Sequence, residues 1–141
     1  MTFGLPAWHP TTVENLQKLE RVHRHGLHFI HGRHLPPPLE QKMMPMAMHL
    51  QHTDLVFFKR CLSGATDFDA MARITERRPL RGDDPQHPKL QPATIRTKFA
   101  ESVFSFRVVE PWNDLPAALK DCPVDQFPAL CKEYLWRNFD Q

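Results

Sequence analysis

The sequence predicts a mainly α fold, a small irregular helical domain that contains a long proline-rich extended loop. Three observations support this prediction. Apolar residues recur every three or four positions in several segments, which is the period of an amphipathic helix. The 14 prolines divide the 141-residue chain into short pieces, so a long bundle helix is not expected beyond residue 30. The hydrophobic fraction of 41% is sufficient for one modest core.

The first predicted helix spans residues 12–31 and has an apolar and a basic side. Thr11 and Glu14 have the spacing of a capping box at its start, and Gly32 ends it. At about 100° per residue, the apolar residues fall on one broad side of the helix. These inward-facing residues are Val13, Leu16, Leu19, Val22, Leu27 and Ile30. The outer side is basic and carries Lys18, Arg21, Arg24, His25 and His28.

A second helical region covers residues 39–63. Its well-formed part is expected at 46–62, because Pro45 interrupts the pattern before it and Gly64 stops the pattern after it. Residues 73–94 then mix arginines, prolines and one glycine without any period. Such a composition predicts an extended loop.

Helical periodicity returns in the last third of the chain. A helix is predicted at residues 97–110, and Pro111 is expected to end it. A short helical piece follows at 115–120. The last helix starts near Asp125, so Pro128 falls in its first turn, where proline is tolerated. Its inward face is predicted to consist of Phe127, Leu130, Tyr134 and Leu135.

The stretch from Arg107 to Pro116 reads RVVEPWNDLP and joins two of these helices. Trp112 is large enough to anchor the junction in the core. Asn113 or Asp114 is expected to cap the short helix that follows. The stretch is therefore interpreted as a structural corner and not as a catalytic loop.

Charge and cysteine content exclude several classes of protein. The formal net charge is only +2, although residues 71–110 carry eight Lys or Arg against five Asp or Glu. Three cysteines without close spacing argue against a disulfide framework and for an intracellular protein, nuclear or cytoplasmic. No signal peptide is recognisable and no apolar run has membrane length, so no membrane partner is expected.

Gly82-Asp83-Asp84 matches a polymerase motif that holds catalytic metals at the tip of a β-hairpin. That hairpin requires apolar strands on both sides of the motif. Here the flanks, residues 77–81 and 85–88, are rich in arginine and proline and are not expected to be strands of a central sheet. The sequence therefore favours a solvated turn over a catalytic site.

Histidines at 25, 28, 31 and 34 recur every three residues. Imidazoles at positions i and i+3 of a helix can share a metal, but successive members of this series rotate around the helix by about 60°. No carboxylate or cysteine joins them at short spacing. A solvated, weakly basic face is favoured over a zinc site, and no catalytic residue, metal ligand or cofactor is predicted.

Several short segments form one ordered pattern. They are Phe3-Gly-Leu-Pro-Ala-Trp8-His-Pro10, Leu19-Glu-Arg-Val22-His-Arg24, Asp54-Leu-Val-Phe-Phe58-Lys59-Arg-Cys-Leu62-Ser-Gly64, Arg81-Gly82, Arg96-Thr97, Phe104, Arg107-Val-Val109 and Trp112-Asn113-Asp-Leu115-Pro116. In this order they resemble the region that follows the polymerase core in non-LTR (LINE-type) retrotransposon reverse transcriptases. The chain departs from the family at His23, His25 and His28, where glutamine or arginine is common, and at the two aspartates after Gly82.

The resemblance implies a fragment of an RNA-directed DNA polymerase. In that family this region forms a helical thumb and a C-terminal extension that guide template and product. The implied parts are a thumb-like helical part at 1–64, an extended basic loop at 65–98 and a C-terminal helical part at 99–141. The family's catalytic aspartates lie upstream, so the chain alone is not expected to be an enzyme. The implied partners are the backbone of an RNA–DNA hybrid and the upstream palm domain.

Two functions stay open at the level of sequence. As a polymerase fragment, the chain is expected to contact nucleic-acid phosphates through its basic helix face and its basic loop. The alternative is a stand-alone α-helical interaction module, or an inert transposon remnant, with the methionines at 43–48 as an adaptable surface. The predicted nucleic-acid-binding residues are Lys18, Arg21, Arg24, His25, His28, Arg77, Arg78, Arg81 and Arg96.

Overall fold

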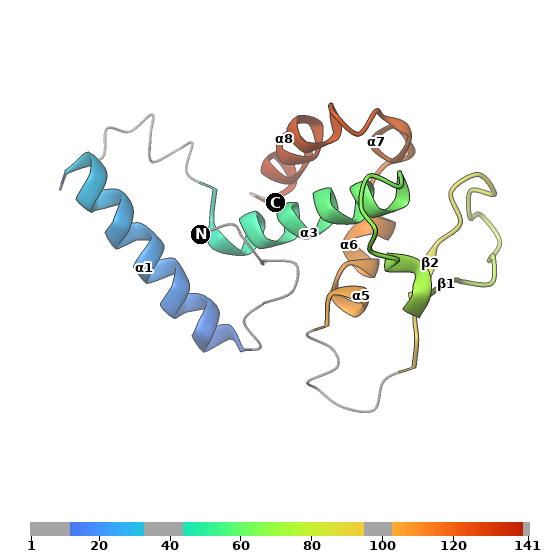
Figure 1. Cartoon of the computed structure of the whole chain (residues 1–141), viewed down its shortest axis with the longest axis horizontal. Helices are drawn as coiled ribbons and strands as arrows, with labels where there is room; N and C mark the ends of the chain where they lie inside the picture. Colours follow the sequence, from blue (N-terminus) through green and yellow to red (C-terminus); the bar gives the residue numbers. More distant parts are fainter. Residues whose placement is uncertain (1–11, 33–43, 95–102, 140–141) are drawn as a thin grey trace.

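The computed structural model describes residues 12–32, 44–94 and 103–139, and most of these residues are helical (Figure 1). The predicted small, mainly α fold is confirmed. Within the described ranges the strands are two, and both are short. The first motif of the family resemblance, at residues 3–10, and the predicted helix start at Thr97 lie outside the described residues.

Helix α1 (Val13–His31) forms where the sequence predicts it. Its N-cap is Thr12, one residue after the predicted Thr11, and the Thr12 side chain accepts a hydrogen bond of 3.2 Å from the backbone N–H of Asn15. Gly32 ends the helix with a φ of 85°. No residue of α1 is buried, and three of the six residues predicted to face inward are exposed: Val13, Val22 and Ile30.

Helix α3 (Met46–Leu62) has the bounds predicted for the well-formed part of the second helical region, and it lies at the centre of the molecule (Figure 1). Glu20 of α1 accepts a hydrogen bond of 2.6 Å from the backbone N–H of Met46, the first residue of α3. This carboxylate replaces a local cap, because Pro45 has no side chain that can cap the helix. Gly64, with a φ of 75°, lies in the turn after the helix, where the N–H of Ala65 returns to the carbonyl of Arg60.

The predicted extended loop at 73–94 is wrong at both of its ends. The chain passes through the short 3-10 helix η1 (Ala70–Arg73) into strand β1 (Ile74–Glu76), which pairs antiparallel with β2 (Leu90–Pro92). Ile74 and Leu90 are the buried positions of the two strands. A three-residue strand with one buried residue is too short to produce a visible period in the sequence, which is why this hairpin was not predicted.

The prediction that Pro111 ends a helix is also wrong. Helix α5 (Phe104–Arg107) is followed, across the helical residue Val108, by α6 (Val109–Asp114), and Pro111 is the third residue of α6. Proline is tolerated there because N–H groups of the first helical turn have no partner within the helix. The chain leaves the helix at Leu115, whose extended conformation is the one that the following proline favours.

Helices α7 (Ala117–Asp121) and α8 (Phe127–Phe139) complete the fold, and Pro128 falls in the first turn of α8 as predicted. The predicted inward face of α8 is wrong at Leu130, whose side chain is 39% exposed. The buried positions are Phe127, Cys131 and Leu135. These three residues are spaced by four and lie on one narrow face of the helix. Leu130 lies beside this face and not on it.

The core gathers around α3, with α7 and α8 above it and α5 and α6 below it in Figure 1. Three aromatic rings form its centre. Trp112 of α6 lies edge-on to Phe58 of α3, with ring centroids 4.9 Å apart, and lies 6.1 Å from Phe127 of α8. The prediction that Trp112 anchors the corner in the core is therefore confirmed.

Candidate nucleic-acid interface

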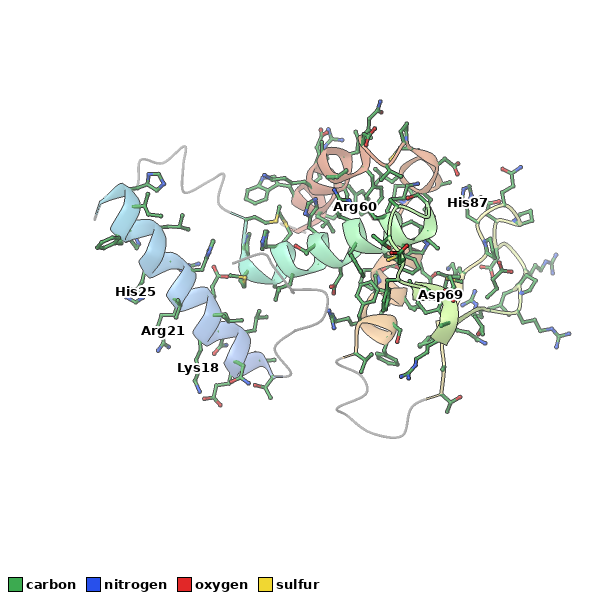
Figure 2. All side chains as sticks on the ribbon, viewed as in Figure 1. Lys18, Arg21, His25, Arg60, Asp69 and His87 are labelled. Carbon is green, nitrogen blue, oxygen red and sulfur yellow. The ribbon has the colours of Figure 1, made fainter. Side chains whose placement is uncertain are left out.

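Four predicted site residues form a stripe along the outer face of α1: Lys18, Arg21, His25 and His28. Their spacings of three, four and three residues place them on one helix face, and all four are exposed. In Figure 2 the labelled side chains of Lys18, Arg21 and His25 extend away from the rest of the molecule. From Lys18 to His28 the stripe is about 15 Å long at 1.5 Å per residue. We call these four residues the α1 stripe.

Permanent charges on α1 are largely paired with one another. Lys18 lies 2.8 Å from Glu14, and Arg24 lies 3.4 Å from Glu20, both at the i,i+4 spacing. Arg21 forms no ion pair with any described residue. The exposed pair of Lys18 and Glu14 contributes only about 0.3–0.5 kcal/mol, so it yields readily to a phosphate. The stripe thus carries little uncompensated charge while its histidines are neutral.

The predicted loop residues differ from one another. Arg77 is half-buried and its Nη2 donates to Asp83 Oδ2 at 2.8 Å, which holds its guanidinium inside the loop. Arg78 and Arg81 are exposed. Arg96 lies outside the described residues. Within the described part of the loop, Arg78 and Arg81 are therefore the predicted residues best placed to meet a phosphate.

Gly82-Asp83-Asp84 lies in a solvated turn between β1 and β2. Gly82 has a φ of 98°, and the N–H of Asp83 closes a turn to the carbonyl of Leu80 at 3.1 Å. The Asp83 carboxylate accepts from the Leu80 N–H and from Arg77, and these two bonds, the first above all, hold its pKa below its usual range. The Asp83 carboxylate therefore stabilises the turn. Neither β1 nor β2 directly adjoins Gly82-Asp83-Asp84.

Asp84 contacts His87, and the sequence did not suggest this contact. Its Oδ2 lies 2.7 Å from His87 Nδ1, while His87 Nε2 lies 2.8 Å from Oδ1 of Asp121, the last residue of α7. Both contacts are hydrogen bonds only when the ring carries a proton on each nitrogen. The Asp121 and Asp84 carboxylates accordingly raise the pKa of His87. Protonated His87 therefore fastens the loop to α7.

The α1 stripe and the basic loop do not form one continuous surface. Helix α1 packs near the start of α3 through Leu16 and Leu19, which contact Met46 and Leu50. The hairpin and its loop lie beyond the other end of α3 (Figure 1). Seventeen helical residues span about 25 Å, so a nucleic acid that reached both regions would have to run the length of α3.

Arg107, another arginine of the basic middle segment, points into the molecule. Its Nε and Nη2 donate to the two oxygens of Asp54 at 2.7 and 3.0 Å, in a bidentate pair between α5 and α3. The two side chains are only 12% and 6% exposed. The sequence contained a signal for this pair, since Asp54 lies four residues after Leu50 and four before Phe58, on the apolar face of α3. A carboxylate there requires a partner.

Two further motif residues form contacts between elements. Asn113 or Asp114 was expected to cap the next helix, but the N-cap of α7 is Pro116 and no side chain caps it. The Asn113 side chain instead pairs with the backbone of Leu90 in β2, accepting from the N–H at 2.8 Å and donating to the carbonyl at 2.9 Å. Lys59 of α3 donates to the carbonyl of Lys120 in α7. Long-range backbone partners of this kind leave no signal in local sequence patterns.

Metal and thiol chemistry find no support in the described ranges. They contain no group of three or more His, Cys, Asp or Glu side chains that could hold a metal ion, and the last member of the histidine series, His34, lies outside them. Cys131 is buried, and this burial, followed by the nearby Cys122, raises its pKa to about 12. Its thiol therefore stays protonated, and Cys131 is a packing residue of the core.

Comparisons with known proteins yielded no matching family model, no matching curated protein and no matching solved structure. Among the described segments, no helix has the length and apolar character needed to cross a membrane. The candidate interface therefore rests on the positions and charges of the residues themselves.

Proposed function

We propose that this chain is the thumb and post-thumb region of a non-LTR retrotransposon reverse transcriptase, and that it contacts the phosphate backbone of an RNA–DNA hybrid without catalysing a reaction itself. The proposal rests on the ordered motifs of the sequence. The contacts between residues of different motifs support it.

The supporting observation is that motif residues far apart in the sequence contact one another. Asp54, from the third motif, pairs with Arg107 of a later motif, over 53 positions. Phe58 of the same early motif packs edge-on against Trp112. Matches that arise by chance are expected to scatter over surface and core alike. Motif residues that complete one another's contacts instead support a single inherited unit.

The same observation separates two roles within the motifs. Asp54 and Trp112 are buried, and the Arg107 side chain is only 12% exposed. These residues hold α3, α5 and α6 together, so they are unavailable to a ligand. The α1 stripe contributes nothing to the core and faces outward. A surface that binds the nucleic-acid backbone needs exposed cations, as on this outward face. It needs no geometry that is specific to a base sequence.

A salt titration of RNA–DNA hybrid binding tests the proposal. Filter binding should be detectable at low ionic strength and should weaken steeply as salt rises from about 50 to 200 mM, because bound phosphates release counterions. Replacing Lys18 and Arg21 by glutamine should reduce the slope of log affinity against log salt by about two. The matched control replaces Arg60 and Lys132, an exposed arginine and an exposed lysine outside the predicted site, by glutamine.

Two results would contradict the proposal. One is the absence of binding at low salt, and the other is an affinity that stays constant over the fourfold rise in salt. An equal loss in the control variant would show that only total charge matters and not the α1 stripe.

A helical interaction module is the second candidate, and one observation favours it. Phe29 and Ile30 of α1 are 92% and 72% exposed. Of the methionines that the sequence suggested for such a surface, Met46 and Met48 are buried, Met44 is half-buried and Met43 lies outside the described residues. The reading frame upstream decides between the candidates. An in-frame segment that encodes Phe/Tyr-x-Asp-Asp favours the polymerase fragment, whereas an isolated frame with its own promoter favours the module.

A further inference from the structure

An apolar side chain lies between two cations in the loop that joins β1 to β2. Leu80 is 61% exposed, and its neighbours Arg78 and Arg81 are exposed as well. Neither of these arginines forms an ion pair with a described residue, whereas Arg77 is paired with Asp83. We call residues 78–81 the loop tip. It presents one large apolar group and two cations that are available to a partner.

We propose that Leu80 is an apolar contact of the nucleic-acid interface, which enters the minor groove of the RNA–DNA hybrid while Arg78 and Arg81 hold phosphates at the two edges of that groove. This inference rests on the proposed function, to which it adds a second contact surface. Because Leu80 carries no charge, its contribution to binding can be separated from that of the arginines.

The backbone of Leu80 is held on both sides by a single residue. Its N–H donates to Asp83 Oδ2 at 2.8 Å, and its carbonyl accepts from the Asp83 N–H at 3.1 Å. Arg77 Nη2 donates to the same carboxylate oxygen at 2.8 Å. One exposed leucine is ordinary on a protein surface, but here the backbone that carries it is fixed. Little conformational freedom is therefore left to lose when Leu80 binds.

The rest of the loop is fastened to the core at two points. The N–H of Arg77 donates to the carbonyl of Lys89 at 2.7 Å, which extends the pairing of β1 and β2 into the loop. His87 lies 2.7 Å from Asp84 and 2.8 Å from Asp121 of α7. In Figure 2 the labelled His87 lies on the opposite side of the molecule from α1. The loop tip is therefore a preorganised surface that is separate from the α1 stripe.

The two aspartates that follow the loop tip already have partners. The Asp83 side chain is only 13% exposed and is paired with Arg77. Asp84 is engaged by His87. The charges of the loop tip itself are positive and exposed, which is the sign that a polyanion requires.

A minor groove fits this arrangement of side chains. Arg78 and Arg81 are three positions apart, so their Cα atoms are at most about 10 Å from one another. The minor groove of B-form DNA is about 6 Å wide, and that of an A-form duplex is wider and shallow. Two long cationic side chains can thus reach phosphates on both edges of the groove. A leucine between them meets the sugars and base edges, and minor-groove-binding proteins use apolar side chains in that position.

A membrane fits the loop tip less well than a nucleic acid does. Binding to a lipid surface scales with the apolar area that is buried in it. At the loop tip only Pro79 and Leu80 are apolar, and both lie between arginines. A groove lined by phosphates requires little more than that one side chain.

The test measures binding of a fluorescently labelled RNA–DNA hybrid by anisotropy over a salt series. Leu80→Ala should bind about tenfold more weakly than wild type at every salt concentration, because apolar contact is lost. The slope of log affinity against log salt should stay that of wild type, because the same phosphates are contacted. Replacing Arg78 and Arg81 by glutamine should instead reduce that slope by about two. The matched control is Leu130→Ala, which shortens an exposed leucine of α8 and should bind as wild type does.

A second variant, Asp83→Ala, tests whether the fixed backbone matters. Charge alone predicts that the loss of a carboxylate strengthens binding to a polyanion. Release of the Leu80 backbone predicts the opposite, so the affinity should fall. Glu76→Ala removes an exposed carboxylate of β1 without touching the loop tip and should not weaken binding. An affinity that rises in Asp83→Ala would overturn the preorganised contact.

The outcomes separate this contact from the proposed function. Wild-type affinity in Leu80→Ala would overturn the contact at Leu80 and leave the proposed function standing. A complete lack of hybrid binding by wild type at low salt would overturn both. An equal loss of binding to single-stranded RNA would overturn the assignment to a groove, as would a loss that affects anionic lipid vesicles and spares the hybrid.

Discussion

Helices α1 and α8 both pack against α3, yet they bury very different parts of themselves. Helix α1 is the longer, with 19 residues against 13, and it has the clearer separation of an apolar and a basic side. None of its residues is buried, whereas α8 buries Phe127, Cys131 and Leu135. The contrast shows that an amphipathic period predicts a helix but does not state what covers its apolar side.

The contrast also assigns different tasks to the two regions. The unit built from α3, the hairpin and α5 to α8 holds one core, with Trp112 between Phe58 and Phe127. Helix α1 is joined to it by Leu16, Leu19 and the bond from Met46 to Glu20. Substitutions in the core should therefore change stability, and substitutions on the outer face of α1 should change binding.

The largest effect is expected at Trp112. Replacing Trp112 by alanine should destabilise the protein by about 3–5 kcal/mol, because a large buried side chain is lost from the centre of the core. Its counterpart on α1 is Phe29→Ala, which removes an exposed ring and should cost less than about 0.5 kcal/mol. Urea unfolding measures both, and equal costs would remove the distinction between core and α1.

The buried ion pair gives the next effect. Arg107→Ala leaves the Asp54 carboxylate buried without its bidentate donor and should cost about 3 kcal/mol in urea unfolding. Replacing both residues by apolar ones, Asp54→Leu with Arg107→Met, should recover much of that loss, since the cost comes from a buried carboxylate that has lost its bidentate donor. A double variant as unstable as the single one would show that the pair itself stabilises the fold. Arg21→Ala on the α1 stripe is the control and should change stability by less than about 0.5 kcal/mol.

A smaller effect of opposite sign is expected within α1. Gly26 lies inside the helix, and a Cβ added there meets no atom within 4 Å. Gly26→Ala should therefore stabilise α1 by up to about 1 kcal/mol. Circular dichroism at 222 nm should show more helix, while the urea midpoint of the core stays unchanged. A midpoint that rises with the helix signal would show that α1 and the core unfold together.

The smallest effect concerns His87. Because Asp121 and Asp84 raise its pKa in the folded state, His87 contributes stability fully below its ordinary value near 6.5 and loses it as the pH rises through the raised value. Urea midpoints of wild type should thus fall relative to those of His87→Gln as the pH increases above about 6.5. Parallel pH profiles of the two proteins would contradict the bridge between the loop and α7.

Sequence patterns predicted the features that depend on local periodicity and punctuation. They placed α1 and α3 and the anchoring role of Trp112, because a long apolar period or a single large residue carries that information. They failed where the deciding partner is distant in sequence. Asn113 or Asp114 was expected to form a local cap, but Asn113 binds Leu90 of β2. Leu130 was assigned to the core, although the buried residue beside it is Cys131.

The residues of the candidate site also differ in how far the sequence could place them. The α1 stripe was predictable from spacing alone, since exposed residues on one helix face need no tertiary partner to be placed. The loop residues were not, because only the folded turn shows that Asp83 engages Arg77 while Arg78 and Arg81 stay exposed. The carboxylates that hold His87 come from a turn and from α7, and this pairing leaves no trace in the sequence.

Hydrogen exchange with and without an RNA–DNA hybrid at low salt tests the central claim most directly. Amides of α3, α6 and α8 should exchange slowly in both states, because their opening requires the core to unfold. Amides of α1 should exchange quickly in the free protein and gain protection when the hybrid binds. Protection that appears in the core helices while α1 stays unchanged would contradict the division between a motif-built core and an α1 interface.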